Sequence, residues 1–179
     1  VVVHGVGLIG LGNVAACSQR GAVVIAIDLQ PHRLEVARKL GADHVIDASS
    51  EDVQMAVAEI APDGADVVFE ATGVPACIDI ALALCRPFGK FVYQGDYGTE
   101  PISFHFRVPH TKRLTTFFPC DDGLAPCRRA VLKNMAMGVL QWEHTITHRV
   151  PAEDAADFYT AIDQGQVKNV VGAVLHWSG

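Results

Sequence analysis

Three glycines near the start of the chain have the spacing of a phosphate-binding turn. Gly5, Gly7 and Gly10 lie between the apolar run 1–4 and a stretch from Leu8 onward whose apolar residues recur at helical spacing. In a strand–turn–helix unit the first glycine permits the tight turn and the second lets a pyrophosphate approach the backbone. The third lets the helix pack against the sheet. Because the helix start also offers free N–H groups at its positive end, the pattern predicts a dinucleotide site.

A carboxylate follows at the distance expected for binding the adenosine ribose of such a dinucleotide. Asp28 ends the second apolar run, 22–28, and comes eighteen residues after Gly10, where it can accept from both ribose hydroxyls. A carboxylate there repels a 2′-phosphate, which favours NAD over NADP. Arg33 either lies along the adenosine or is a solvated arginine on a helix surface. Two alternatives stay open: a turn of the same fold in which Asp28 only caps a helix, and a methyltransferase, which the glycine spacing fits less well.

A regular alternation of strands and helices positions these residues. Continuous apolar runs predict buried strands, and segments of helical periodicity predict the helices between them. Ser49 is placed to cap the third helix. The alternation predicts an α/β fold, a Rossmann-type doubly wound parallel sheet with helices on both faces. The predicted strands are 1–4, 22–28, 44–47, 65–73 and 89–98, and the predicted helices are 8–20, 31–40, 51–60, 75–85 and 123–138.

The alternation ends near residue 96, and the last part of the chain has a different order of elements. We expect 1–140 to form the nucleotide-binding domain and 141–179 to form a short C-terminal appendage. Within the appendage the sequence predicts a strand at 144–150, a helix at 151–163 and a second strand at 169–177.

Composition excludes several classes of function. Half of the 179 residues are apolar, the formal net charge is −6, and there is no long basic run, so nucleic acid and anionic membranes are not expected partners. No apolar stretch is long enough to span a bilayer. The five cysteines are an odd number, which we interpret as reduced thiols in a cytoplasmic protein. The chain starts inside an apolar run without a Met, so we interpret it as a piece of a longer protein.

Four segments resemble one known family. The runs "GVGLIGLGN", "GAVVIAIDLQPHRLEVARKLGADHVID", "DVVFEATG" and "GKFVYQGD" are similar to the cofactor-binding half of the medium-chain, zinc-dependent alcohol and polyol dehydrogenases. The resemblance is strong over 1–95 and looser to the C-terminus. It implies reversible oxidation of an alcohol by NAD, with zinc in the full-length parent and a small-molecule alcohol as substrate.

The resemblance also implies roles for individual residues. It assigns the glycine loop to the pyrophosphate, Asp28 and Arg33 to the adenosine, 71–73 to the adenosine and nicotinamide-ribose side, and 94–96 to the carboxamide. Many members carry a basic residue in the last strand that reaches the pyrophosphate, and here Gly172 or Ala173 takes its place. The cofactor-binding residues so implied are Gly5, Val6, Gly7, Leu8, Ile9, Gly10, Asp28, Arg33, Ala71, Thr72, Gly73, Gln94, Gly95 and Asp96.

The zinc ligands of the family lie in a catalytic domain that precedes the glycine loop. The histidines of this chain are scattered along it, so we expect no metal site and no catalytic residue here, and an isolated chain without activity. Two alternatives remain: a stand-alone NAD-binding or sensing module without catalysis, and a zinc-free quinone or enoyl reductase of the same superfamily.

The segment 102–118 bears on assembly. Family members pair the edge strands of this domain across a two-fold axis. Phe104, Phe106, Phe117 and Phe118 are many aromatic residues for an exposed edge. We therefore expect an edge strand near 102–118 and a homodimer or homotetramer through it; the alternative is that these rings face the domain's own core.

Overall fold

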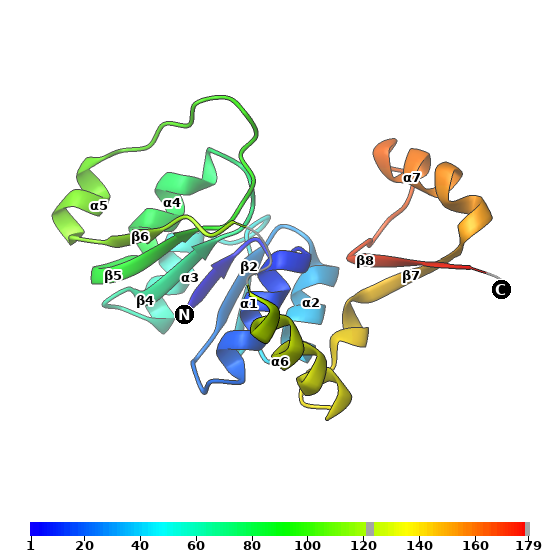
Figure 1. The fold of residues 1–179 in the computed structure, drawn as a ribbon. Coiled ribbons are helices and arrows are strands. Elements are labelled where there is room, and N and C mark those ends of the chain that lie inside the picture. The colour runs from blue at the N-terminus through cyan, green and yellow to red at the C-terminus, as the bar shows by residue number, and fades with distance from the viewer. Residues whose placement is uncertain (121–123, 178–179) are drawn as a thin grey trace.

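A six-stranded parallel sheet forms the centre of the molecule (Figure 1). The computed structural model describes residues 1–120 and 124–177. The strand order β3-β2-β1-β4-β5-β6 reverses direction between β1 and β4, which confirms the predicted Rossmann-type doubly wound sheet. The strands are β1 (Val2–His4), β2 (Ile25–Asp28), β3 (His44–Asp47), β4 (Ala65–Glu70), β5 (Cys85–Tyr93) and β6 (Thr115–Phe117).

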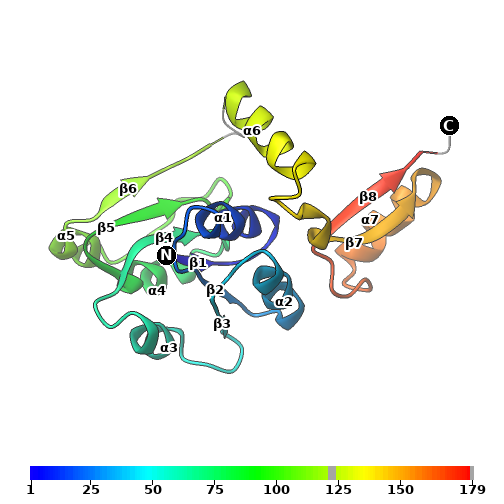
Figure 2. The same cartoon turned by 90° about the horizontal axis from the view of Figure 1, so that it is seen from below.

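Helices cover both faces of this sheet (Figure 2). Val2 and Val3 are neighbours in β1 and both are fully buried, yet they belong to different core clusters because successive side chains of a strand point to opposite faces. The cluster of Val3 includes residues of two helices, and the cluster of Val2 includes residues of two others. These pairs are α1 (Leu8–Ser18) with α2 (Pro31–Lys39), and α3 (Val53–Ile60) with α4 (Cys77–Leu84).

The cap predicted for the third helix is wrong. α3 begins at Val53, and its N-cap is Asp52, whose side chain accepts from the N–H of Met55 at 2.9 Å. Ser49 instead donates its hydroxyl to Asp47 at 2.5 Å, so it belongs to the turn that follows β3. A carboxylate three residues closer to the helix therefore takes the capping role.

The segment 102–118 is only partly a strand. Residues 101–105 form a loop, and α5 (Arg107–Lys112) follows it, so that β6 alone is a strand at this edge. Asp79 holds the loop against α4, because its carboxylate accepts from the backbone N–H of His105 at 2.8 Å. The expectation of an edge strand across 102–118 is therefore corrected to the three residues of β6.

The C-terminal part forms a small unit beyond α2 (Figure 1). Its two strands pair in parallel as a separate sheet, and a helix connects them. We call residues 141–177 the C-terminal unit. The elements after β6 are α6 (Ala125–Ala136), η1 (Trp142–Thr145), β7 (Ile146–Pro151), η2 (Ala152–Asp154), α7 (Ala155–Asp163) and β8 (Gly172–His176).

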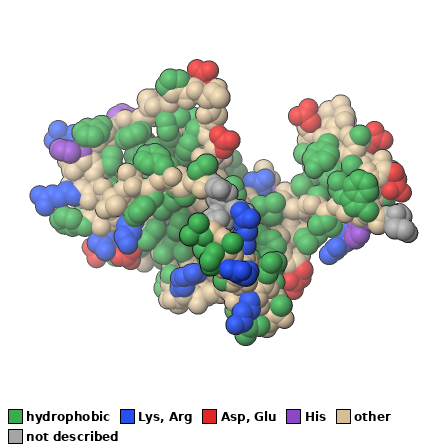
Figure 3. Space-filling view, in the orientation of Figure 1, with side chains coloured by type: hydrophobic (Ala, Val, Ile, Leu, Met, Phe, Trp, Pro, Cys, Tyr) green, Lys and Arg blue, Asp and Glu red, His purple; other side chains and the backbone are tan. Residues whose placement is uncertain are grey.

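Two side chains of the C-terminal unit, together with the residue just before it, contact the main body. Leu140, Trp142 and Val171 pack against the core cluster that α1 and α2 form with their face of the sheet. Outside these contacts Figure 3 shows the surface hollowed between the main body and the C-terminal unit, with lysine and arginine side chains gathered over α6. Among the described residues, no helix is long and apolar enough to cross a membrane.

Candidate functional site

The predicted cofactor residues gather at one edge of the sheet. Strands β1, β2, β4 and β5 are parallel, so the loops that follow them all leave from the same edge. This edge includes the point between β1 and β4 where the strand order reverses, which is where doubly wound sheets bind ligands. The structure thus brings together segments that lie far apart in the sequence, from the glycine loop at Gly5 to Asp96.

The three glycines of the loop have different surroundings. Gly5 has φ +87°, and a Cβ on it would lie 2.8 Å from the backbone N of Thr72. A Cβ on Gly10 would lie 2.0 Å from the carbonyl oxygen of Gly5. A Cβ on Gly7, in contrast, would meet nothing within 4 Å. Gly5 and Gly10 are therefore needed for backbone packing, whereas Gly7 leaves its side of the loop open to a ligand.

Two N–H groups of the loop are already used inside the protein. Gly5 donates to the carbonyl of Ile27 at 2.8 Å, and Val6 donates to Oδ2 of Asp28 at 2.9 Å. Val6 therefore holds the carboxylate in place, and its own N–H is not free for a pyrophosphate.

The N–H groups left for an anion are those of the first turn of α1. The helix begins at Leu8, and its N-cap, Gly7, has no side chain that could cap it. The first N–H groups of a helix lack an intrahelical acceptor and lie at the positive end of its dipole. Leu8 and Ile9 are also 45% and 57% exposed, so a ligand at this turn would cover apolar surface as well.

Asp28 is buried and oriented by backbone donors. Its Oδ2 accepts from Val6 and its Oδ1 accepts from the N–H of Gln30, both at 2.9 Å. Each carboxylate oxygen has two lone pairs, so each keeps one site for a further donor. The guanidinium of Arg33 lies 3.7 Å from Oδ2, and its Nε is buried without a partner among the described residues. The acidic and basic groups predicted for the adenosine are thus side by side.

The loops after β4 and β5 touch each other through glycines. Gly73 has φ +70°, and a Cβ on it would lie 2.6 Å from the carbonyl oxygen of Asp96. A Cβ on Gly95 would lie 2.4 Å from the backbone N of Gly73. Ala71 donates its N–H to the carbonyl of His4 at 2.8 Å, which keeps the first of these loops next to the end of β1.

The sequence does not predict a role at this edge for Asn13, Glu70 or Tyr97. Asn13 on α1 donates to the side-chain oxygen of Gln94 at 2.6 Å and so ties the glycine helix to the loop after β5. Glu70, the last residue of β4, accepts hydrogen bonds from Thr72 and from the hydroxyl of Tyr97. The one sequence signal for Asn13 is its place in the run "GLGN". A charged residue at the end of a buried strand is the signal for Glu70.

His4 is a second buried polar side chain at this edge. It is only 5% exposed, and its Nδ1 has no partner among the described residues. Burial lowers the pKa of His4, against the opposing effect of the carboxylates of Glu70 and Asp28. The ring is therefore neutral at pH 7.

The described residues do not fit a zinc ion. No group of three or more histidine, cysteine or acidic side chains within 1–120 and 124–177 could hold a metal. The predicted strand that would carry His144 and His148 is shorter than expected, because His144 belongs to η1 and only His148 lies in β7. Cys85 is buried, and burial raises the pKa of its thiol to about 12, so it stays protonated.

Comparisons with known proteins agree with this fold. The family model described as zinc-binding dehydrogenase matches residues 8–122. Erythritol/L-threitol dehydrogenase of Mycolicibacterium smegmatis is 32% identical over 154 residues, which are 84% of this chain and 42% of that protein. The chain therefore spans less than half the length of this curated relative.

Two similar solved structures are described with a nicotinamide cofactor. A zinc-binding dehydrogenase of Sinorhizobium meliloti bound to NADP has TM-score 0.85 and 25% identity, over 97% of this chain and 51% of that one. An alcohol dehydrogenase of Escherichia coli CFT073 with NADH has TM-score 0.83 and 25% identity, over 97% of this chain and 51% of that one.

Proposed function

Because the chain belongs to the zinc-binding dehydrogenase family, we propose that it is the cofactor-binding portion of an alcohol or polyol dehydrogenase and that it binds NAD. The observation that supports this best is the pairing of a buried, oriented Asp28 with the open first turn of α1. One group is suited to ribose hydroxyls and the other to a pyrophosphate. A bound NAD supplies the hydride acceptor for alcohol oxidation.

Asp28 favours NAD over NADP. A 2′-phosphate would lie against a carboxylate that is already fixed by two backbone N–H groups and cannot turn away. Two like charges about 4 Å apart repel by about 1–4 kcal/mol, depending on the local dielectric. Arg33, 3.7 Å from the same carboxylate, supports a second candidate, in which the guanidinium binds a 2′-phosphate.

Calorimetric titration with NAD and with NADP tests the proposal. We expect the chain to bind NAD more tightly than NADP, Asp28→Asn to reduce this preference, and Arg33→Ala to leave it unchanged. Asp43→Asn is a matched control, because Asp43 accepts from the N–H of Val24 at 2.8 Å at the other end of β2. Tighter binding of NADP, lost in Arg33→Ala, would favour the second candidate, and binding of neither dinucleotide would contradict both.

The isolated chain is proposed to lack dehydrogenase activity. Its described residues offer no zinc site, and the chain spans 42% of the relative from Mycolicibacterium. Within the longer protein, we propose that the C-terminal unit packs against the remaining residues. Alcohol-dependent formation of NADH by the purified chain, above a heat-denatured control, would contradict this proposal.

We also propose a dimer through β6. All three residues of β6 are exposed, and the strand has a pairing partner only on the β5 side among the described residues, so its other edge can pair with a second copy. Sedimentation velocity at micromolar concentration should show a dimer, and Thr116→Lys should shift it to a monomer because a charged side chain disfavours edge pairing. A monomeric wild type would contradict the proposal.

A further inference from the structure

Glu70 is a fully buried carboxylate at the same edge of the sheet as the cofactor loop. It ends β4, its side chain is 0% exposed, and it forms no ion pair with any described residue. Burial of a charge is costly unless hydrogen bonds compensate for it. Three neutral donors supply that compensation: the N–H of Thr72 at 3.0 Å, the hydroxyl of Thr72, and the hydroxyl of Tyr97.

These contacts join two different loops at one residue. Thr72 belongs to the loop after β4 and Tyr97 to the loop after β5. The backbone carbonyl of Glu70 also accepts from the N–H groups of Gln94 and Gly95, at 2.8 and 2.9 Å. The hydroxyl of Thr72 in turn accepts from the N–H of Val74 at 3.0 Å, which fixes the first loop further. An apolar side chain could fill the same space but could not bind both loops.

The two loops belong to one half of the dinucleotide site. A doubly wound sheet binds a dinucleotide across two mononucleotide-binding halves. Asp28 on β2 and the glycine loop after β1 place the adenosine and the pyrophosphate over the β1–β3 half. The loops after β4 and β5 are therefore left for the nicotinamide half.

We propose that Glu70 is a positioning residue for the nicotinamide half of the cofactor. It acts through Thr72 and Tyr97, whose hydroxyls it holds so that both loops keep one arrangement before the cofactor arrives. This inference rests on the proposed function. Pre-organised loops save the ordering cost that binding would otherwise include.

The test compares NAD with ADP, which carries the adenosine and the diphosphate but lacks the nicotinamide riboside. Tyr97→Phe removes the hydroxyl and keeps the ring, which contacts Tyr93 at a centroid distance of 6.4 Å. We expect NAD to bind about 10-fold more weakly, as the loss of one hydrogen bond to a charged group implies. Binding of ADP should change by less than about twofold.

Two further variants complete the design. Glu70→Gln keeps the size of the side chain but replaces an acceptor oxygen by an NH₂ donor, so it should show the same selective loss. His105→Ala is the control, because His105 binds the same loop to Asp79 at 2.6 Å but is 83% exposed. This variant should leave both affinities unchanged.

Each outcome decides a separate question. A selective loss of NAD affinity in Tyr97→Phe supports the positioning role. Equal weakening of NAD and ADP binding would mean that Glu70 only stabilises the fold. No weakening would mean that the hydrogen bond between Tyr97 and Glu70 does not affect cofactor binding. Either result overturns the inference while the proposed function stands. Failure of the wild type to bind either ligand would overturn both.

Discussion

The main sheet and the C-terminal unit both contain a strand–helix–strand segment, but the strands of the main sheet are buried more completely. β1–α1–β2 and β7–α7–β8 are both strand–helix–strand units with parallel strands. All three residues of β1 are buried, whereas β7 alternates between half-buried and exposed residues. The same order of elements thus gives a strand with both faces buried in the main sheet and a strand with one face exposed in the C-terminal unit.

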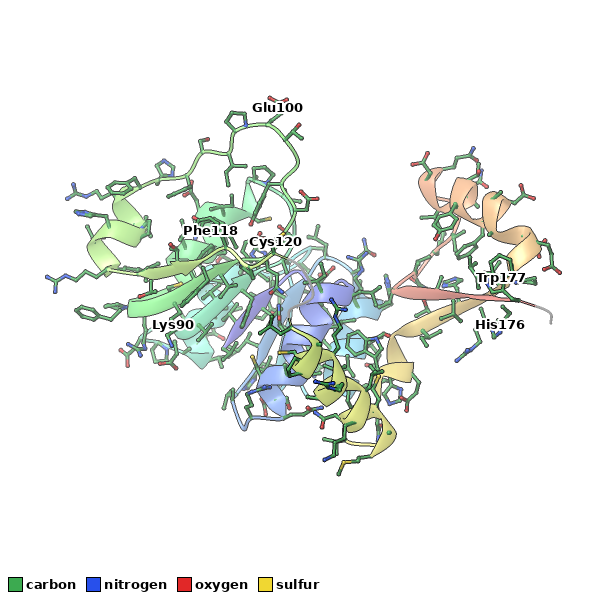
Figure 4. The ribbon with its side chains drawn as sticks, in the orientation of Figure 1. Lys90, Glu100, Phe118, Cys120, His176 and Trp177 are labelled. Atoms are coloured by element: carbon green, nitrogen blue, oxygen red, sulfur yellow. The ribbon has the colours of Figure 1, made fainter. Side chains whose placement is uncertain are left out.

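The difference shows that the order of elements does not by itself make a core. Only Thr145 and Gly172 are buried among residues 141–177. Figure 4 shows Trp177 and His176 at the far end of this unit, well away from Phe118 and Cys120 beside the main sheet. Because sheets of two strands are marginal without further packing, the C-terminal unit depends on its contacts with other surfaces.

The largest difference should come from two glycines of one helix. A Cβ on Gly10 would collide with the backbone of Gly5, but a Cβ on Gly12 would meet only the ring of Trp142, at 3.9 Å. We expect Gly10→Ala to lower the free energy of unfolding by about 3 kcal/mol or more and to abolish NAD binding. Gly12→Ala should raise it by about 0.5–1 kcal/mol, since alanine favours helix. Chemical denaturation measures both, and a similar effect of the two substitutions would contradict the geometry of the loop.

Two tryptophans test how the C-terminal unit is held. Trp142 packs on the core of the main sheet, while Trp177 is 81% exposed. Trp142→Ala should cost about 2 kcal/mol or more, and limited proteolysis should then cut between the two regions sooner. Trp177→Ala should stay within about 0.5 kcal/mol of the wild type. Faster cleavage in Trp177→Ala than in Trp142→Ala would mean that the anchor lies elsewhere.

Two aspartates, one at the start of α3 in the main body and one at the start of α7 in the C-terminal unit, should differ in their effect on stability, with smaller changes than those above. Asp52 caps α3 through its side chain, whereas Asp154, at the N-cap of α7, makes no such bond. Asp52→Ala should therefore cost about 1 kcal/mol, and Asp154→Ala less than about 0.5 kcal/mol. Thermal unfolding of both variants decides the point, and an equal loss would show that the cap at Asp52 is not what stabilises α3.

A pH dependence should arise in the main sheet from His4. Its folded-state pKa is lowered by burial, whereas in the unfolded chain it is about 6.5. The unfolded state therefore takes up the proton first, so stability is complete above about pH 6.5 and is lost as pH falls toward the folded pKa. His4→Leu should flatten this part of the stability curve between about pH 7.5 and 5, and an unchanged slope would contradict the assignment.

The fold could be predicted because its signals are local. Strands 3–9 residues long alternate with helices that have clear starts, and the glycine spacing with Asp28 marks the edge that carries the site. α5 is only six residues long, too short for a periodic pattern, so the sequence predicts 102–112 as part of an edge strand. The helix predicted for 51–60 begins two residues later, at Val53, and its cap is Asp52, three residues after Ser49.

The remaining contacts of the site could not be read from the sequence, because they join distant residues. Asn13 and Gln94 are 81 residues apart, and Glu70 and Tyr97 are 27 apart. No periodicity marks such pairs, since each depends on which loops the sheet order brings together. Gly172 also contacts a residue distant in sequence, because a Cβ on it would lie 2.9 Å from the carbonyl oxygen of Thr145. A larger residue at this position, such as the basic residue that the family resemblance implies, would therefore collide with the backbone.

Hydrogen–deuterium exchange of the chain with and without saturating NAD tests the central claim most directly. The account predicts slower exchange at the first turn of α1, near Asp28, and in the loops 71–73 and 94–97. Exchange in β7 and β8 should stay unchanged. Protection that falls mainly on the C-terminal unit, or no protection at any of these segments under conditions where NAD binds, would contradict the placement of the cofactor at the carboxyl edge of the main sheet.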